Sequence, residues 1–208
     1  MNLGADLAQG AAELHCGLSG DAVRKLCDYL ALIRKWNRIY NLTAVREPRK
    51  MLSHHLLDCL AVVPHITASS ILDVGTGAGL PGIPLALALP QARVTLLDSN
   101  QKKAAFLRQA AIELALDNVE VVSERIETWQ TPHRFDLVIS RAFSTLRDFL
   151  AAAGRLCAVG GMLASMKGVH PFEELSEVPG EFKVRDVIAL DVPGLPAHRH
   201  LVLMQPAR

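Results

Sequence analysis

The sequence predicts an α/β protein in which a mostly parallel sheet follows an N-terminal helical extension. Three observations support this prediction. Strand-like and helix-like stretches alternate from residue 67 to the fifth strand at 162–166, which is typical of a parallel sheet with helical crossovers. A short apolar strand at 71–74 runs into a Gly-rich turn and then a helix. Residues 1–66 carry only helical periodicity, so we divide the chain into an extension (1–66) and a sheet domain (67–208).

The extension contains a predicted helix at 21–40, capped by Ser19-Gly20-Asp21. Its apolar positions recur every three or four residues, and Trp36 and Tyr40 lie on that stripe. We therefore expect both aromatic side chains in the core rather than as platforms on which bases stack.

A second helix is predicted to start near Pro48 and to continue to Pro64. It carries His54, His55 and Asp58. Because adjacent helical residues point to different faces, we expect only one of the two histidines to be buried.

Positive charge is concentrated in the extension. The whole chain has 22 basic and 21 acidic residues, yet between Asp21 and Lys50 eight basic residues face three acidic ones. Such a surface is either an ordinary solvated helix face or a binding surface for a phosphate backbone. Charge alone leaves both interpretations open.

The Gly-rich turn at Gly75, Gly77 and Gly79 is the strongest local signal. Glycines there permit positive φ and let a ligand approach the backbone N–H groups at a helix start. The turn fits the dinucleotide pattern G-x-G-x-x-G and also the acidic loop of S-adenosylmethionine (SAM)-dependent methyltransferases. Both interpretations predict an adenosine ligand.

Two further stretches are expected at the same carboxyl edge of the sheet. The next strand, 94–98, ends in Asp98, whose carboxylate can accept both ribose hydroxyls of an adenosine. After a helix from residue 101 and a third strand at 119–122, Ile126 and Glu127 are expected to meet the adenine edge. An ordinary helix start with acids in its first turn explains Glu127 equally well.

Two cations end the following strands. The fourth strand, 135–140, leads into Arg141, and the fifth, 162–166, follows a helix at 146–157 and leads into Lys167. At a topological switch point Arg141 is expected to face the reacting end of the ligand, although an ion pair with a structural acid is the alternative.

The C-terminal part lacks a crossover helix. Residues 182–190 and 200–204 alternate as strands and are joined by a Pro/Gly-rich link, so they should be antiparallel. A dehydrogenase would continue with parallel units, which argues against the dinucleotide interpretation.

Four scattered cysteines show no metal-ligand spacing, and we expect no metal site and no disulfide framework. No apolar run is long enough for a membrane span, and no signal segment opens the chain, so we expect a cytoplasmic protein without a membrane partner.

Taken together, these stretches resemble one family, the ribosomal RNA small-subunit methyltransferase G family (RsmG, also GidB). The resemblance covers nearly the whole chain and rests on motifs in the family's order, namely 36–43, 54–58, 73–84, 140–143, 167–168 and 199–202. It implies a Rossmann-like SAM-dependent methyltransferase fold with a seven-stranded sheet and an antiparallel last strand. His54 departs from the family, where many members have arginine.

The resemblance also implies an activity: SAM-dependent methylation of N7 of the guanine at nucleotide 527 of bacterial 16S rRNA. It implies that Gly75 and Leu80 line the methionine side of SAM, that Asp98 binds the ribose, that Ile126 and Glu127 bind the adenine, and that Arg141 lies between cofactor and substrate. With Gly77 and Gly79, these form the expected cofactor site; Arg141 and Lys167 are the expected catalytic residues. The expected partner is 16S ribosomal RNA, free or in small-subunit particles, and the expected state is a monomer.

Guanine N7 carries a lone pair and no proton, so its methylation requires alignment and no general base. We expect Arg141 to hold guanine O6 or a flanking phosphate, and Lys167 to hold phosphate. A SAM-dependent methyltransferase of small molecules and an NAD-binding module are the alternatives.

Overall fold

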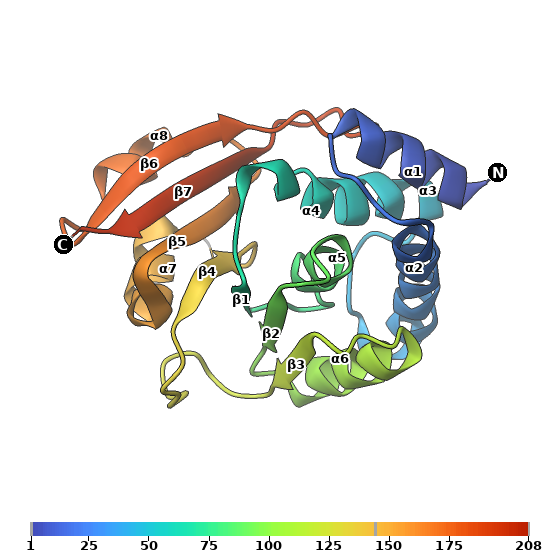
Figure 1. Cartoon of the computed structure of the whole chain (residues 1–208), viewed down its shortest axis with the longest axis horizontal. Helices are drawn as coiled ribbons and strands as arrows, with labels where there is room; N and C mark the ends of the chain where they lie inside the picture. Colours follow the sequence, from blue (N-terminus) through green and yellow to red (C-terminus); the bar gives the residue numbers. More distant parts are fainter. Residues whose placement is uncertain (1, 144, 208) are drawn as a thin grey trace.

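A computed structural model of the chain describes residues 2–143 and 145–207 and contains one seven-stranded sheet (Figure 1). The strand order is β3-β2-β1-β4-β5-β7-β6. β7 is antiparallel to both of its neighbours, while the pairings among β1 to β5 are parallel. The predicted fold class, with its inserted antiparallel last strand, is confirmed. The strands are β1 (Ser70–Val74), β2 (Arg93–Leu97), β3 (Val119–Val122), β4 (Phe135–Ser140), β5 (Cys157–Lys167), β6 (Phe182–Ala189) and β7 (His200–Pro206).

The strand order changes direction at β1: β2 and β3 lie on one side of it, and β4 and β5 lie on the other. β1 pairs with β2 on one side and with β4 on the other, and Asp73 is in register with Leu96 and Ile139. In open α/β sheets the crevice beyond the carboxyl ends of such strands is where ligands bind. The loops after β1, β2 and β4 therefore meet at one place.

Helices cover both faces of the sheet. The helices of the sheet domain are α5 (Gly82–Ala88), α6 (Gln101–Glu113), α7 (Leu146–Ala153) and α8 (Phe172–Ser176). α5 and α6 pack with the N-terminal helices on one face, and α7 packs on the other, where it forms a second hydrophobic cluster (Figure 1).

The predicted boundaries around β5 are wrong. The helix after β4 changes to a 3₁₀ turn at Gly154–Leu156, and β5 begins at Cys157 rather than at residue 162. Gly160, which suggests a turn, has φ +78° within the strand, and the β4–β5 register shifts between Phe135 and Leu137. A bulge in the pairing therefore accommodates the glycines without ending the strand.

The extension consists of α1 (Leu3–Glu13), α2 (Gly20–Tyr40) and a second helical segment. The predicted cap of α2 is confirmed, because Ser19 Oγ accepts the N–H of Ala22 at 3.1 Å. The second segment is not one regular helix: α3 (Pro48–Met51) continues through a π-helical stretch, Leu52–Leu57, into α4 (Asp58–Leu60), and a 3₁₀ turn follows at Val63–His65. These helices share one hydrophobic core with β1, β2 and α6.

The prediction that Trp36 and Tyr40 of α2 both lie in the core is only partly right for Trp36 and is wrong for Tyr40. Trp36 is half-buried, with its ring 5.6 Å from the ring of Phe106 on α6. Tyr40 is 38% exposed and packs on Trp36, with the ring centroids 5.3 Å apart. Trp36 occupies the available space against α6, so the ring one turn later remains at the surface.

In the part of the chain that the structure describes, no helix combines the length and the apolar character needed to cross a membrane.

Candidate functional site

Asp73, the acidic residue of β1, is buried beneath the Gly-rich loop and holds it through hydrogen bonds. Its Oδ2 accepts the hydroxyl of Thr76 at 2.5 Å and the N–H of Gly82 at 2.7 Å. Burial raises the pKa of this carboxyl to about 6, although both hydrogen bonds act to lower the pKa. Asp73 Oδ1 is buried with no hydrogen-bond partner among the described residues. The acid therefore fixes the loop between β1 and α5, and one acceptor atom remains unused.

Asp98 holds the loop from the next strand. Its Oδ2 accepts the N–H of Gly77 at 2.9 Å and its Oδ1 accepts the N–H of Asn100 at 2.8 Å. The Lys103 ammonium lies 3.9 Å from Oδ2. Because each carboxylate oxygen has two lone pairs, Asp98 can still accept hydroxyl groups of a ligand.

A cavity of about 350 Å³ brings four of the predicted cofactor residues together: Gly75, Asp98, Ile126 and Glu127. Ala142 and Phe143, which follow β4, line it as well. The 126–129 loop is held in place by Arg155, whose guanidinium donates to the carbonyls of Ile126 and Trp129 at 2.7 and 2.9 Å. Sequence reasoning missed Arg155, because it lies on a different element and no spacing links it to this loop.

A second cavity, of about 180 Å³, shares Gly75 and Ala142 with the first. Three further predicted residues, Gly77, Leu80 and Arg141, line it. Its remaining lining is formed by Leu42, Thr43, Thr76 and Ala78. The two cavities are therefore adjacent along the loops after β1, β2 and β4, and we call them together the ligand region.

The glycines of the loop keep this region open. Gly75 has φ +67°, and a Cβ there would lie 3.0 Å from the Cβ of Ala142. Gly77 has φ +63°, and a Cβ there would have no neighbour nearer than the Gly75 carbonyl oxygen at 3.9 Å. A side chain at either position would constrict the ligand region. An elongated ligand with a diol and an adenine-sized ring therefore fits the acceptors and the space that the residues provide.

Two predicted site residues lie outside both cavities. A Cβ on Gly79 would be 2.7 Å from Ile83 Cδ1 and 3.0 Å from Leu107 Cδ2, so this glycine permits close packing of the loop on α5 and α6. Lys167 is buried at the end of β5, where its ammonium lies 2.8 Å from Glu174 Oε2. The roles of both residues in binding and catalysis remain predictions.

Arg141 forms the ion pair that the sequence offered as the alternative, and its position at the reacting end of the ligand remains a prediction. It lines the second cavity, and its guanidinium also donates to Asp58 Oδ2 and to the His54 carbonyl, both at 3.2 Å. Asp58 Oδ1 accepts from Arg199 Nε at 2.9 Å. One buried carboxylate therefore orients two arginines from distant parts of the chain. The signal for Asp58 was an acid within the apolar run 56–60.

The segment after α2 forms the remaining wall. The Asn37 amide donates to the Thr43 carbonyl and accepts its N–H, each at 2.9 Å. Thr43 Oγ1 lies 2.9 Å from His55 Nε2. Burial, followed by the charge of Arg141, lowers the pKa of His55 to about 4, so this ring is neutral at pH 7. His55 is buried and His54 is half-buried, as the sequence predicted.

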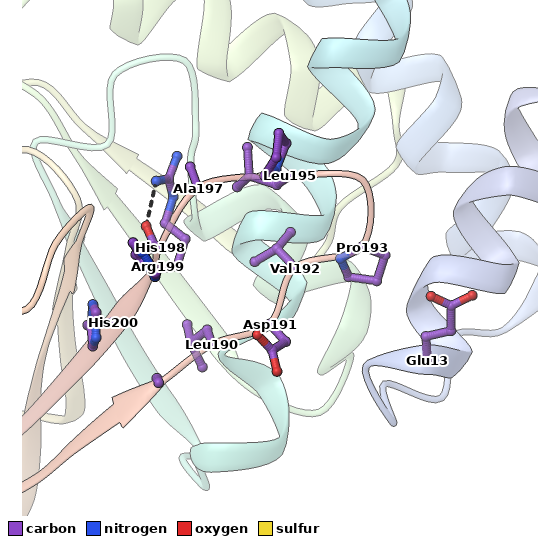
Figure 2. A pocket seen from close by; sticks show the side chains of 12 residues that line it. Glu13, Leu190, Asp191, Val192, Pro193, Leu195, Ala197, His198, Arg199 and His200 are labelled. Atoms are coloured by element: carbon purple, nitrogen blue, oxygen red, sulfur yellow. Dashed lines mark hydrogen bonds between the residues drawn. The ribbon is translucent and has the colours of Figure 1, made fainter.

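A separate hollow of about 540 Å³ lies between the end of α1 and the β6–β7 link (Figure 2). Glu13 lies on one side and residues 189–200 on the other. Arg199 lines it and donates to the neighbouring His198 carbonyl at 2.9 Å. None of the predicted site residues lines this hollow, so it is not the adenosine site.

This sheet order, with a Gly-rich loop facing a carboxylate across β1 and β2, defines the class of SAM-dependent methyltransferases. Solved structures share the fold. The O-methyltransferase TomG from Streptomyces achromogenes, determined in complex with SAM, superimposes with a TM-score of 0.60 at 20% identity, covering 88% of this chain and 90% of TomG. TrmN from Thermus thermophilus gives a TM-score of 0.59 at 19% identity, and the match covers 82% of this chain but only 53% of TrmN.

The chain belongs to the rRNA small subunit methyltransferase G family, whose model (GidB) matches residues 22–202. The Ribosomal RNA small subunit methyltransferase G of Nitrosospira multiformis is 55% identical, covering 100% of this chain and 99% of its own length. The protein of the same name from Laribacter hongkongensis is 52% identical over 97% of this chain and 98% of its own length. The resemblance noted in the sequence is confirmed, and the cofactor of this class is SAM.

Proposed function

We propose that this protein methylates N7 of the guanine at nucleotide 527 of 16S ribosomal RNA, using SAM. Family membership supports ribosomal RNA as the substrate. The choice of atom and nucleotide comes from the resemblance to the family, and the observation that supports it is the lining of the second cavity, which is composed of apolar and glycine residues, two threonines and Arg141. No described residue of this lining is a carboxylate or an imidazole.

That lining suits an acceptor that has no proton to lose. Exocyclic amines and hydroxyls need a partner that removes a proton, whereas guanine N7 offers a lone pair in the plane of the ring. The imidazole of His55 reaches this wall only through its contact with Thr43, in a supporting position behind the cavity. The chain therefore contributes alignment.

The two cavities divide the cofactor between them. Asp98, Ile126 and Glu127 would hold the adenosine part, and Gly75, Gly77 and Leu80 the methionine part. When bound, SAM supplies a methyl group on a positively charged sulfur. Gly75 and Ala142 line both cavities and would contact the cofactor where its two parts join.

Arg141 is the proposed catalytic residue that orients the guanine. Its position at the end of β4 and its partners Asp58 and His54 hold a permanently charged guanidinium at the second cavity, which we call the methyl-transfer cavity. It would hold guanine O6 or a flanking phosphate, because a grip on N7 would block the nucleophile. Lys167 would bind a phosphate further along the same edge.

The test is to map N7-methylguanine in 16S rRNA after reaction. Small subunits and naked 16S rRNA from a bacterium that lacks this methylation are incubated with the protein and labelled SAM. Chemical cleavage at N7-methylguanine should give one new stop, at nucleotide 527. Label at another atom or nucleotide, or no label on either RNA substrate, contradicts the proposal. Comparing the two substrates also shows whether the protein acts on free or particle-bound RNA. We propose in addition that the protein works in the cytoplasm and as a monomer.

The alternative of a small-molecule methyltransferase predicts SAM turnover that does not depend on RNA. An NAD-binding module is not favoured, because the sheet ends in the antiparallel β7 rather than in further parallel units.

A further inference from the structure

The C-terminal end of α2 exposes an apolar and an aromatic side chain side by side. Ile39 is 74% exposed and Tyr40 is 38% exposed, and together they form what we call the α2 tip. The two residues stand apart from the large aliphatic residues earlier in the helix, Leu26, Leu30, Leu32 and Ile33, which are buried.

The α2 tip has a fixed position relative to the methyl-transfer cavity. Tyr40 packs on Trp36, which in turn packs on Phe106, so the ring is oriented in advance. Two residues further along, Leu42 and Thr43 line the cavity. The Asn37 amide connects the last turn of α2 to Thr43 through two hydrogen bonds of 2.9 Å. The tip and the cavity wall therefore form one rigid unit.

The charges around the tip fit a polyanion. Arg34, Lys35 and Arg38 are exposed on the last two turns of α2. No acidic residue occurs in the sequence between Asp28 and Glu47. An apolar pair that follows three exposed cations on the same helix is well suited to single-stranded RNA, which presents base faces and phosphates together.

We propose that the α2 tip stacks against the bases that flank the target guanine, and so holds the RNA loop open while the guanine lies beside Arg141 at the methyl-transfer cavity. This inference rests on the proposed function and specifies which surface binds the RNA. Removing a base from its stack costs a few kcal/mol, and a preformed apolar contact that replaces the former neighbour offsets part of that cost. Tyr40 supplies a ring face, Ile39 supplies an apolar edge, and the three cations bind the adjacent phosphates.

The experiment uses the full chain with changes only at the tip. The test variant is Ile39→Ser with Tyr40→Ala. Tyr40→Phe retains the ring, and Ile112→Ser is the matched control, because Ile112 is a 75% exposed isoleucine on α6. Each protein is assayed for kcat/KM on the small subunit and on a naked RNA fragment of the target loop, and for affinity for S-adenosylhomocysteine. A copy of the fragment with 2-aminopurine at the target position reports unstacking by its fluorescence.

The expected result is a loss of about 10-fold or more in kcat/KM on both RNA substrates for the double variant. For the same variant, the increase in 2-aminopurine fluorescence when the RNA fragment binds should be smaller. S-adenosylhomocysteine affinity should be unchanged, and Tyr40→Phe and Ile112→Ser should behave like the unaltered protein.

Three outcomes would overturn the inference. The first is a double variant whose kcat/KM and fluorescence stay within twofold of the unaltered protein. The second is a loss on the subunit but none on naked RNA, since that would make the tip a contact for a ribosomal protein. The third is an equal loss of S-adenosylhomocysteine affinity, since the tip would then merely support the cavity. Failure of the proposed function is separate, because the unaltered protein would then leave N7 of nucleotide 527 unmethylated.

Discussion

Among single residues, Asp58 has the widest influence on the site. It is buried, and it contacts Arg141 on one oxygen and Arg199 on the other. A carboxylate shared by two guanidinium groups keeps both in fixed orientations, because charge-assisted hydrogen bonds are short and directional. We therefore assign Asp58 a positioning role rather than a catalytic one.

Replacing Asp58 by Asn should lower the methyl-transfer rate more than it lowers cofactor affinity. The Arg141 guanidinium would lose its ionic partner, and misplacement of a positioning group by about 1 Å can cost about 100-fold in rate. We expect a fall of about 10- to 100-fold in kcat. Single-turnover methylation and calorimetry with S-adenosylhomocysteine measure the two effects. Asp28→Asn, which alters an exposed acid beside Arg24, is the control, and an unchanged kcat in D58N would show that Asp58 does not position Arg141.

His55 gives the protein a predictable dependence of stability on pH. Its pKa in the folded state is about 4, below the ordinary value of 6.5, so below pH 6.5 the unfolded chain takes up a proton that the folded protein does not. This contribution to stability is present at pH 7 and is lost as the pH falls from about 6.5 to 4. Between pH 7 and pH 5 it amounts to about 2 kcal/mol.

His55→Gln should remove that dependence. The difference in free energy of unfolding between the two proteins should shrink by about 2 kcal/mol on going from pH 7 to pH 5, as measured by urea denaturation at each pH. His65→Gln, at an exposed position, should leave the pH dependence intact. A constant difference across this range would mean that folding leaves the pKa of the His55 ring at its ordinary value.

At the scale of elements, the junction of β1, the Gly-rich loop and α5 is the most tightly packed part of the site. A Cβ at Gly82 would overlap Leu96 Cδ2 on β2 and lie 2.8 Å from Asp73 Oδ2. The first turn of α5 can therefore lie against the sheet only with glycine at this position. This packing fixes how closely the first turn of α5, and the loop before it, approach β1.

Gly82→Ala should consequently destabilise the fold and weaken cofactor binding together. Overpacking of this kind costs typically about 1–3 kcal/mol, and here the displaced groups include the Asp73 carboxylate that fixes the loop. Thermal unfolding and S-adenosylhomocysteine titration measure both effects. Gly180→Ala is the matched substitution, because a Cβ there meets nothing within 4 Å, and equal stability of the two variants would contradict the packing argument.

At the scale of the whole molecule, the question is whether the positive charge of α2 forms a binding surface for RNA. The basic face of α2 lies on the side of the molecule opposite β6 and α7 (Figure 1). If α2 binds RNA phosphates, removing one cation that pairs with a phosphate should reduce the dependence of log affinity on log salt by about 0.7 for single-stranded RNA. Charge reversal at Arg34, Lys35 and Arg38 should therefore weaken RNA binding and reduce the salt slope by about 2.

Reversal of Arg147, Lys183 and Arg185 is the control of equal net charge on the far side, where all three are exposed. Filter binding at several salt concentrations measures both slopes. If the salt slope falls equally in both triple variants, net charge alone drives binding and the α2 surface has no special part in it.

The sequence by itself determined the seven strands in chain order, the Gly-rich turn, and the acid at the end of the second strand. These features are local: alternating apolar runs, glycines at close spacing and caps such as Ser19 depend on neighbours in the chain. The family followed from several such motifs in a fixed order. The boundaries of β5 could not be predicted, because Gly160 suggests a turn and only pairing with β4 keeps it in a strand.

Only the tertiary structure decided which residues meet. Asp58 lies 83 positions from Arg141 and 141 positions from Arg199 in the chain, and no periodicity connects the three. Tyr40 lies on the apolar stripe of α2, yet it is exposed, since Trp36 already occupies the space against α6. The physical reason is the same in both cases: a local pattern specifies which face of an element is apolar, whereas the packing of distant elements decides how far that face is covered and which charges it brings together.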